Sequence, residues 1–158
     1  MRIGVVGMGW VGASVAISLL HEGLVRELWL AGAKPGLAEG EAMDLAHAAS
    51  LLHRVKVEAR DVADMREADA IVVAAGRGGG PGDTRLSLLR GNAEIVRSIA
   101  AELDGFGGLL VMVSNPVDVL TRVMVDASGL PPARVLCTGT LLDTARLREH
   151  LAAPLEGG

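Results

Sequence analysis

The feature of this sequence that most restricts its fold is the hexapeptide Gly7-Met8-Gly9-Trp10-Val11-Gly12. The segment before it, Ile3–Val6, carries no charge and suits a buried strand. After it the pattern becomes helical, and the predicted apolar face of the helix consists of Val11, Val15 and Leu19. Glycines at this spacing permit a tight turn, close approach to the backbone, and packing of the helix on the strand. The order strand, glycine turn and helix therefore predicts the first unit of a sheet with helical crossovers.

Short apolar runs alternate with helical spacing along the rest of the chain, which is typical of a parallel sheet covered by helices on both faces. Right-handed crossovers then predict an α/β, doubly wound sheet in the order 3-2-1-4-5-6, with ligands at the carboxyl ends of the strands. The six predicted strands are Ile3–Val6, Glu27–Ala31, Val55–Ala59, Ala70–Ala75, Leu109–Val113 and Val135–Cys137.

Two helices have clear limits in the sequence. The longer is predicted over Thr84–Leu103, directly after the glycine-rich stretch Gly76–Gly82. A second, about Pro116–Ala127, begins with proline in its first turn and ends before Gly129. The stripe predicted to be buried on the longer helix is Leu86, Leu89, Ala93, Val96, Ala100 and Leu103.

Composition excludes several classes of protein. The net charge is −4, and the thirteen arginines are scattered, so we expect no nucleic-acid partner. A single cysteine, Cys137, encodes neither a disulfide framework nor a metal site, which suits a reducing, cytoplasmic setting. Ile3–Leu20 is uncharged, but its four glycines break the helix that a membrane span requires. We therefore expect a cytoplasmic protein of one main domain with no membrane segment.

The glycine turn predicts a site for the pyrophosphate of a dinucleotide at the N-terminus of the first helix. An NAD site usually has Asp or Glu at the end of the second strand, but Gly32 stands there, and Lys34 follows. The missing acid and the nearby cation hint at NADP, whereas Lys34 in a plain solvated turn would leave the choice open, so NAD or NADP is expected. The predicted cofactor-binding residues are Gly7, Gly9, Trp10, Val11, Gly12, Gly32, Lys34, Ala75, Gly76 and Asn115.

Five ordered motifs cover the whole chain: Gly-Met-Gly-Trp-Val-Gly, Glu41-Ala42-Met43-Asp44-Leu45, Pro81-Gly82-Asp83-Thr84-Arg85-Leu86, Ser114-Asn115-Pro116-Val117-Asp118 and Gly139-Thr140-Leu141-Leu142-Asp143-Thr144-Ala145-Arg146. Together they resemble the motifs of the lactate/malate dehydrogenase family. The last motif and Asp83-Thr84-Arg85-Leu86 resemble lactate-type members slightly more than malate-type members. The resemblance implies hydride transfer between a nicotinamide cofactor and a small 2-hydroxy acid or its 2-oxo acid, in a dimer or tetramer.

The resemblance also assigns roles to four residues. Arg85 matches the arginine that polarises the substrate carbonyl, and Asn115 matches the asparagine that contacts the nicotinamide ribose and the substrate oxygen. Arg146 matches the arginine that binds the substrate carboxylate, and Asp143 matches the acid that orients the catalytic imidazolium. The same residues also have plain structural interpretations: a surface arginine, a helix cap before Pro116, and a surface ion pair on one helical face.

Two departures from the family pattern matter. Gly79 occupies the position where family members carry the side chain that discriminates substrates, so the identity of the acid stays open. The family's catalytic histidine belongs to a Gly-Glu-His-Gly motif that this chain does not contain. The histidines not expected to replace it are His21, His47, His53 and His150.

These observations predict that residues 1–140 form the dinucleotide-binding domain and that residues 141–158 begin a helix leading into a further, substrate-binding domain. Family members run to about twice this length, so we expect the chain to bind the cofactor with little turnover by itself. The alternative is a stand-alone, non-catalytic dinucleotide-binding or regulatory module, which the glycines at positions 32 and 79 favour slightly.

Overall fold

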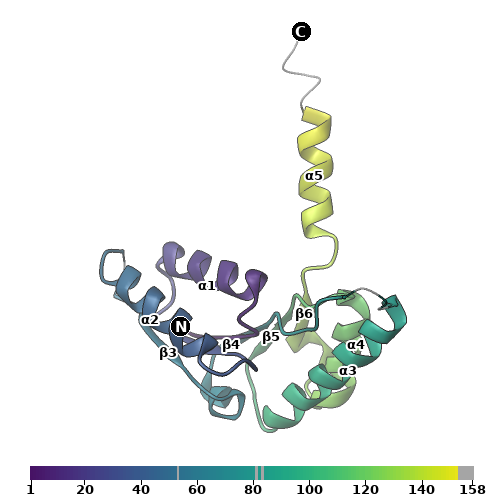
Figure 1. Cartoon of the computed structure of the whole chain (residues 1–158), viewed down its shortest axis with the longest axis horizontal. Helices are drawn as coiled ribbons and strands as arrows, with labels where there is room; N and C mark the ends of the chain where they lie inside the picture. Colours follow the sequence, from purple (N-terminus) through teal and green to yellow (C-terminus); the bar gives the residue numbers. More distant parts are fainter. Residues whose placement is uncertain (53, 81, 83, 153–158) are drawn as a thin grey trace.

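The computed structural model describes residues 1–52, 54–80, 82 and 84–152. These residues contain a single six-stranded sheet in the order β3-β2-β1-β4-β5-β6, and every neighbouring pair is parallel (Figure 1). The predicted doubly wound Rossmann topology is confirmed. The strands are β1 Arg2–Val6, β2 Glu27–Ala31, β3 Lys56–Ala59, β4 Ala70–Val73, β5 Leu109–Met112 and β6 Val135–Cys137.

Helices cover both faces of the sheet. In Figure 1, α1 and α2 lie on one side of the strands and α3 and α4 on the other. The α-helices are α1 Trp10–Glu22, α2 Leu37–Ala49, α3 Arg85–Glu102, α4 Val117–Ser128 and α5 Leu141–Ala152, and the short 3-10 helices are η1 Val62–Glu67 and η2 Pro132–Arg134.

The core consists of two apolar layers separated by the sheet. Successive strand residues point to opposite faces, so Val5 packs in the layer under α1 and α2, whereas Val6 packs in the layer under α3 and α4. Leu28 and Trp29 on β2 divide in the same way, and both are almost fully buried. Burial on both faces explains why the strands read as continuous apolar runs.

The predicted element limits agree with the structure or differ from it by one residue, except that β4 ends two residues early. Ala74 still donates its backbone N–H to the Val6 carbonyl at 2.8 Å. Beyond it the chain leaves the sheet, because β1 has already turned away at Gly7, and the Ala75 carbonyl accepts a hydrogen bond from the Ser114 hydroxyl at 2.6 Å. Pro116 is the N-cap of α4 and not its first helical residue, and the Asn115–Pro116 peptide is cis.

Two predicted helix faces need correction. Helix α1 buries Gly12, Ala16 and Leu20, one position further along than the predicted face, because the smallest side chains allow the closest approach to the sheet. Within the predicted stripe of α3, Leu86 is 56% exposed, since the first turn of that helix projects past the packed layer.

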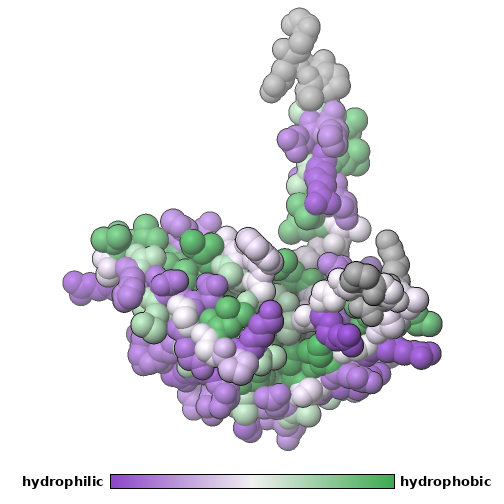
Figure 2. Space-filling model, in the orientation of Figure 1, coloured by the Kyte–Doolittle hydropathy of each residue, from purple (hydrophilic) through white to green (hydrophobic). Residues whose placement is uncertain are grey.

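Helix α5 stands apart from the sheet and its covering helices (Figure 1). None of its residues is buried, and Figure 2 shows hydrophobic as well as polar side chains on its surface. Its exposed hydrophobic residues are Leu141, Leu142, Leu147 and Leu151. Among the described residues, no helix is both long and apolar enough to span a membrane.

Candidate dinucleotide-binding site

The glycine turn joins three strands at their carboxyl ends. Gly7 donates its backbone N–H to the Ala31 carbonyl at 2.8 Å, has φ +104°, and would place a Cβ 2.4 Å from the backbone nitrogen of Ala75. A Cβ on Gly12 would lie 1.8 Å from the Gly7 carbonyl oxygen. Packing within the chain therefore requires glycine at both positions, whether or not a ligand is bound.

Gly9 differs, because a Cβ there would have no heavy atom within 4 Å. It is the N-cap of α1, and no side chain caps that helix end. The first amides of a helix lack intrahelical acceptors and carry partial positive charge. The open space in front of Gly9 therefore suits an anionic group such as a pyrophosphate, which can approach the backbone closely.

Among the hollows that border the glycine turn, two are lined in part by Ala75 and lie along the carboxyl edge of the sheet. The inner hollow has a volume of about 340 Å³ and is lined by Val6, Gly7, Ala31, Gly32, Ala33, Arg60, Asp61, Val62, Ala75, Ile95, Ser98, Ile99 and Glu102. The β5 hollow has a volume of about 200 Å³ and is lined by Val11, Ala74, Ala75, Gly76, Arg77, Gly78, Asn92, Val113, Ser114 and Asn115. Together they follow the carboxyl edge of the sheet, where a doubly wound fold binds its ligand.

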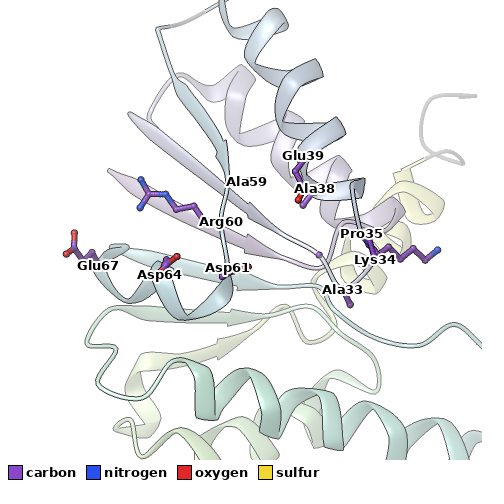
Figure 3. A pocket seen from close by; sticks show the side chains of 11 residues that line it. Ala33, Lys34, Pro35, Ala38, Glu39, Ala59, Arg60, Asp61, Asp64 and Glu67 are labelled. Carbon is purple, nitrogen blue, oxygen red and sulfur yellow. The ribbon is translucent and has the colours of Figure 1, made fainter.

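A wider, outer hollow of about 650 Å³ adjoins the inner one at the ends of β2 and β3 (Figure 3). Its lining includes Gly32, Lys34, Arg60 and Asp61. The Arg60 guanidinium lies 4.0 Å from the centre of the Trp29 ring and bonds to Glu58 at 2.9 Å. Figure 3 shows the Lys34 and Arg60 side chains pointing to opposite sides, so the two cations do not converge on one point.

Asn92 on α3 is a site residue that the sequence reasoning missed. It is only 5% exposed, its Oδ1 accepts the backbone N–H of Arg77 at 2.7 Å, and its Nδ2 donates to the Asn115 carbonyl at 3.0 Å. It thereby ties the chain after β4 to the chain after β5, at the floor of the β5 hollow. The available signal was a polar residue within the apolar stripe of α3, which must find partners when buried.

The structure brings together six of the predicted cofactor residues, which line the inner or the β5 hollow: Gly7, Val11, Gly32, Ala75, Gly76 and Asn115. Gly9 and Gly12 shape the turn between them. Trp10 is 94% exposed and, like Lys34, lines neither of these two hollows. Trp10, Lys34 and Gly9 instead line a separate hollow of about 530 Å³ beside α1 and α2.

The predicted substrate residues are more dispersed. Arg85 begins α3, and its side chain lies outside the described part of the structure. Asp143 and Arg146 lie on α5, form an ion pair at 3.2 Å with both side chains more than 60% exposed, and line neither hollow. The three histidines that the structure describes, at positions 21, 47 and 150, are all exposed, and His53 lies outside the described residues.

The residues present fit a dinucleotide: the turn leaves open space at Gly9, and a hollow lies on either side of it. A parallel sheet of this order with such a turn defines a dinucleotide-binding Rossmann domain. Residues 1–137 match the family model described as lactate/malate dehydrogenase, NAD binding domain. The chain therefore belongs to the lactate/malate dehydrogenase family, and the predicted resemblance is confirmed.

Relatives in sequence and in structure agree with this assignment. L-lactate dehydrogenase 2 of Lactococcus lactis subsp. lactis is 46% identical in a match that covers 98% of this chain and 50% of that protein. The ligand-bound crystal structure of minor L-lactate dehydrogenase from Enterococcus mundtii superposes with a TM-score of 0.94 at 39% identity, over 98% of this chain and 50% of that one. The structure of malate dehydrogenase from Archaeoglobus fulgidus in complex with NADH gives a TM-score of 0.90 at 38% identity, over 97% and 53% of the two chains. The chain spans about half the length of these relatives.

Proposed function

We propose that this chain supplies the cofactor site and part of the substrate site of an enzyme that transfers a hydride between a nicotinamide cofactor and a small 2-hydroxy acid or 2-oxo acid. The observation that carries the proposal is the pair of hollows on either side of an uncapped glycine turn. When bound, the cofactor supplies the hydride. The chain's own residues hold the two nucleotide halves and orient the acid.

Each part of the site has a distinct task in this proposal. The amides after Gly9 hold the pyrophosphate, and the inner hollow, with apolar walls such as Val6 and Ile99, holds the adenosine half. The β5 hollow holds the nicotinamide half, with Asn115 contacting the ribose and the substrate oxygen. Asn92 fixes the Asn115 carbonyl at 3.0 Å and is thus a positioning residue.

Substrate contacts come from arginines. Arg85 polarises the carbonyl on which negative charge develops, and Arg146 binds the carboxylate through its planar two-pronged donor group. The exposed ion pair leaves Arg146 available, because its partner Asp143 holds only one side of the guanidinium in a well-hydrated setting. Asp143 orients the imidazolium of the catalytic histidine. The 158 residues contain no Gly-Glu-His-Gly segment, so this histidine is not among them.

The division into residues 1–140 and 141–158 belongs to the same proposal. It is supported by the absence of buried residues along the described part of α5, in contrast to the covering helices. Four exposed leucines on α5 give it an apolar surface that suits contact with further protein. Homo-oligomeric assembly and a cytoplasmic location remain predictions.

The cofactor part is tested by titrating the 158-residue chain with NADH and NADPH and following the protein by calorimetry and tryptophan fluorescence. We expect saturable binding of at least one of the two, with AMP as a competitor. A chain that binds neither dinucleotide would overturn the proposal.

The substrate part is tested on the NADH-loaded chain by adding pyruvate or oxaloacetate and following the amide of Asn115 and the guanidinium of Arg146 by NMR. Both signals should move, and Arg146→Ala should abolish the shift at Asn115. Arg148→Ala is the matched control, because Arg148 is an exposed arginine on the same helix. Equal responses in the two variants would contradict the role of Arg146.

A further inference from the structure

Asp61 lies one strand away from the position where the ribose-binding acid is missing. Strands β2 and β3 are parallel with Leu30 opposite Ala59, and the Arg60 amide donates to the Leu30 carbonyl at 2.9 Å. Continuing this register by two residues places Asp61 opposite Gly32. Adjacent strands are about 4.8 Å apart. The side chain of Asp61 is therefore attached to the backbone directly beside the position that usually carries the ribose-binding acid.

Asp61 also borders both spaces that meet at Gly32. It lines the inner hollow and the outer hollow, and Gly32, Ala33 and Arg60 are the other residues common to the two. Its side chain forms no hydrogen bond or ion pair with the residues that the structure describes, although it is the N-cap of η1. The carboxylate is thus free to accept hydrogen bonds from a ligand.

The charges around the outer hollow disfavour a phosphate group there in addition to the pyrophosphate at the glycine turn. Four carboxylates line it, against the two cations Lys34 and Arg60; the carboxylates belong to Glu39, Asp61, Asp64 and Glu67. Arg60 is engaged by Glu58 and stacked on Trp29, and Lys34 points away from it (Figure 3). A 2′-phosphate placed here would therefore meet net negative charge without a converging pair of cations.

We infer that Asp61 takes the place of the acid missing at Gly32 and selects NADH over NADPH by accepting hydrogen bonds from the adenosine ribose hydroxyls. This inference rests on the proposed cofactor site. It reverses the hint toward NADP that Gly32 and Lys34 gave in the sequence, because the neighbouring strand restores the negative charge. The same carboxylate that binds the 2′-hydroxyl repels a 2′-phosphate.

The test compares dissociation constants for NADH and NADPH, measured by calorimetry on the wild-type chain and on Asp61→Asn. Hydrogen bonds to charged groups are worth enough for about a tenfold effect. Wild type should therefore prefer NADH by at least about tenfold, and Asp61→Asn should reduce that ratio by about tenfold. AMP and 2′-phospho-AMP, tested as isolated adenosine halves, should show the same change of preference.

Two further variants separate the hydrogen bond from general charge. Asp64→Asn removes the same charge from the outer hollow without touching the inner one, and it should leave the NADH affinity nearly unchanged. Gly32→Asp in the Asp61→Asn background should restore the preference, because a Cβ at Gly32 meets only ordinary contacts, 3.5 Å from Met8 and 3.7 Å from Ala38.

The outcomes distinguish this inference from the proposed function. Wild type that binds neither dinucleotide contradicts the proposed function itself. Wild type that binds both within about threefold of each other overturns the inference and leaves the cofactor site intact. An unchanged ratio in Asp61→Asn, or an equal loss in Asp64→Asn, shows that Asp61 is not the selecting residue.

Discussion

Replacing Gly12 by alanine should destabilise the fold, whereas replacing Gly9 should impair only ligand binding. A Cβ on Gly12 would lie 1.8 Å from the carbonyl oxygen of Gly7, and real Cβ atoms keep at least 3.0 Å from such neighbours. The obstacle is backbone, so no rotamer change relieves it. Helix α1 must move away from the turn and from the sheet beneath it.

The expected loss follows from two opposing effects. Overpacking costs up to about 3 kcal/mol when the neighbours cannot yield, and alanine in a helix regains about 1 kcal/mol over glycine. We expect Gly12→Ala to lower the free energy of unfolding by about 2 kcal/mol. Gly40→Ala in α2 is the matched control, because its Cβ would have no atom within 4 Å, so it should gain up to about 1 kcal/mol.

Gly9→Ala separates the effect on ligand binding from the effect on folding stability. Its φ of −88° suits alanine and its Cβ meets nothing within 4 Å, so stability should fall by no more than about 1 kcal/mol, which is the preference for glycine over alanine at an N-cap. The new methyl group lies in the space assigned to the pyrophosphate, so NADH affinity should fall at least about tenfold.

Urea unfolding followed by circular dichroism gives the stabilities, and calorimetry gives the NADH affinities. Refutation takes either of two forms. If Gly12→Ala is as stable as Gly40→Ala, the close contact does not determine the packing of α1. If Gly9→Ala binds NADH like wild type, the pyrophosphate does not lie at this turn.

Three other changes have defined outcomes. Asn92→Ala leaves the Arg77 amide and the Asn115 carbonyl without their partner, so urea unfolding should show a loss of about 1–3 kcal/mol, with NADH binding reduced more than AMP binding; equal reductions would contradict its position beside the nicotinamide half. Hydrogen bonds from Lys56, and then from Arg60, lower the pKa of Glu58 below its ordinary value of 4.5, so this carboxylate stabilises the fold above about pH 4.5 and loses that contribution as the pH falls through the lowered pKa. Glu58→Gln should therefore show a shallower loss of stability between pH 6 and 3, and the difference should shrink in high salt because the three side chains are at least partly exposed to solvent. Arg146→Ala should leave the urea midpoint unchanged, since its ion pair with Asp143 is well solvated, and a marked shift would indicate a structural role for that pair.

The strand order could be predicted, and the strand limits to within two residues, because buried parallel strands leave a clear apolar signal in the sequence. Val5 and Val6 pack on opposite layers, so neither face of β1 is polar. The face of α1 was misjudged because apolar periodicity favours large residues, whereas contact with the sheet at Gly12 and Ala16 depends on small ones.

The site was only partly predictable for a different reason. The glycines mark the turn through local backbone geometry, which the sequence encodes directly. Asn92 and Asp61 act through pairings between distant segments, 23 residues apart for Asn92 and Asn115, and through the register of β2 with β3. Such pairings arise only when the sheet has formed. The sequence marks Asn92 as a polar residue within an apolar stripe, but it does not identify the partners of Asn92 or the residue opposite Asp61.

Placement of the cofactor at the carboxyl edge of the sheet is tested most directly by locating NADH on the isotope-labelled chain through amide chemical shifts. Binding at the glycine turn predicts that the largest changes occur at Gly9, Trp10 and Val11, with further changes at Gly32 and Asn115. Changes confined to α4 and α5, or no changes at saturating NADH, would contradict the assignment of the cofactor to the carboxyl edge of the sheet.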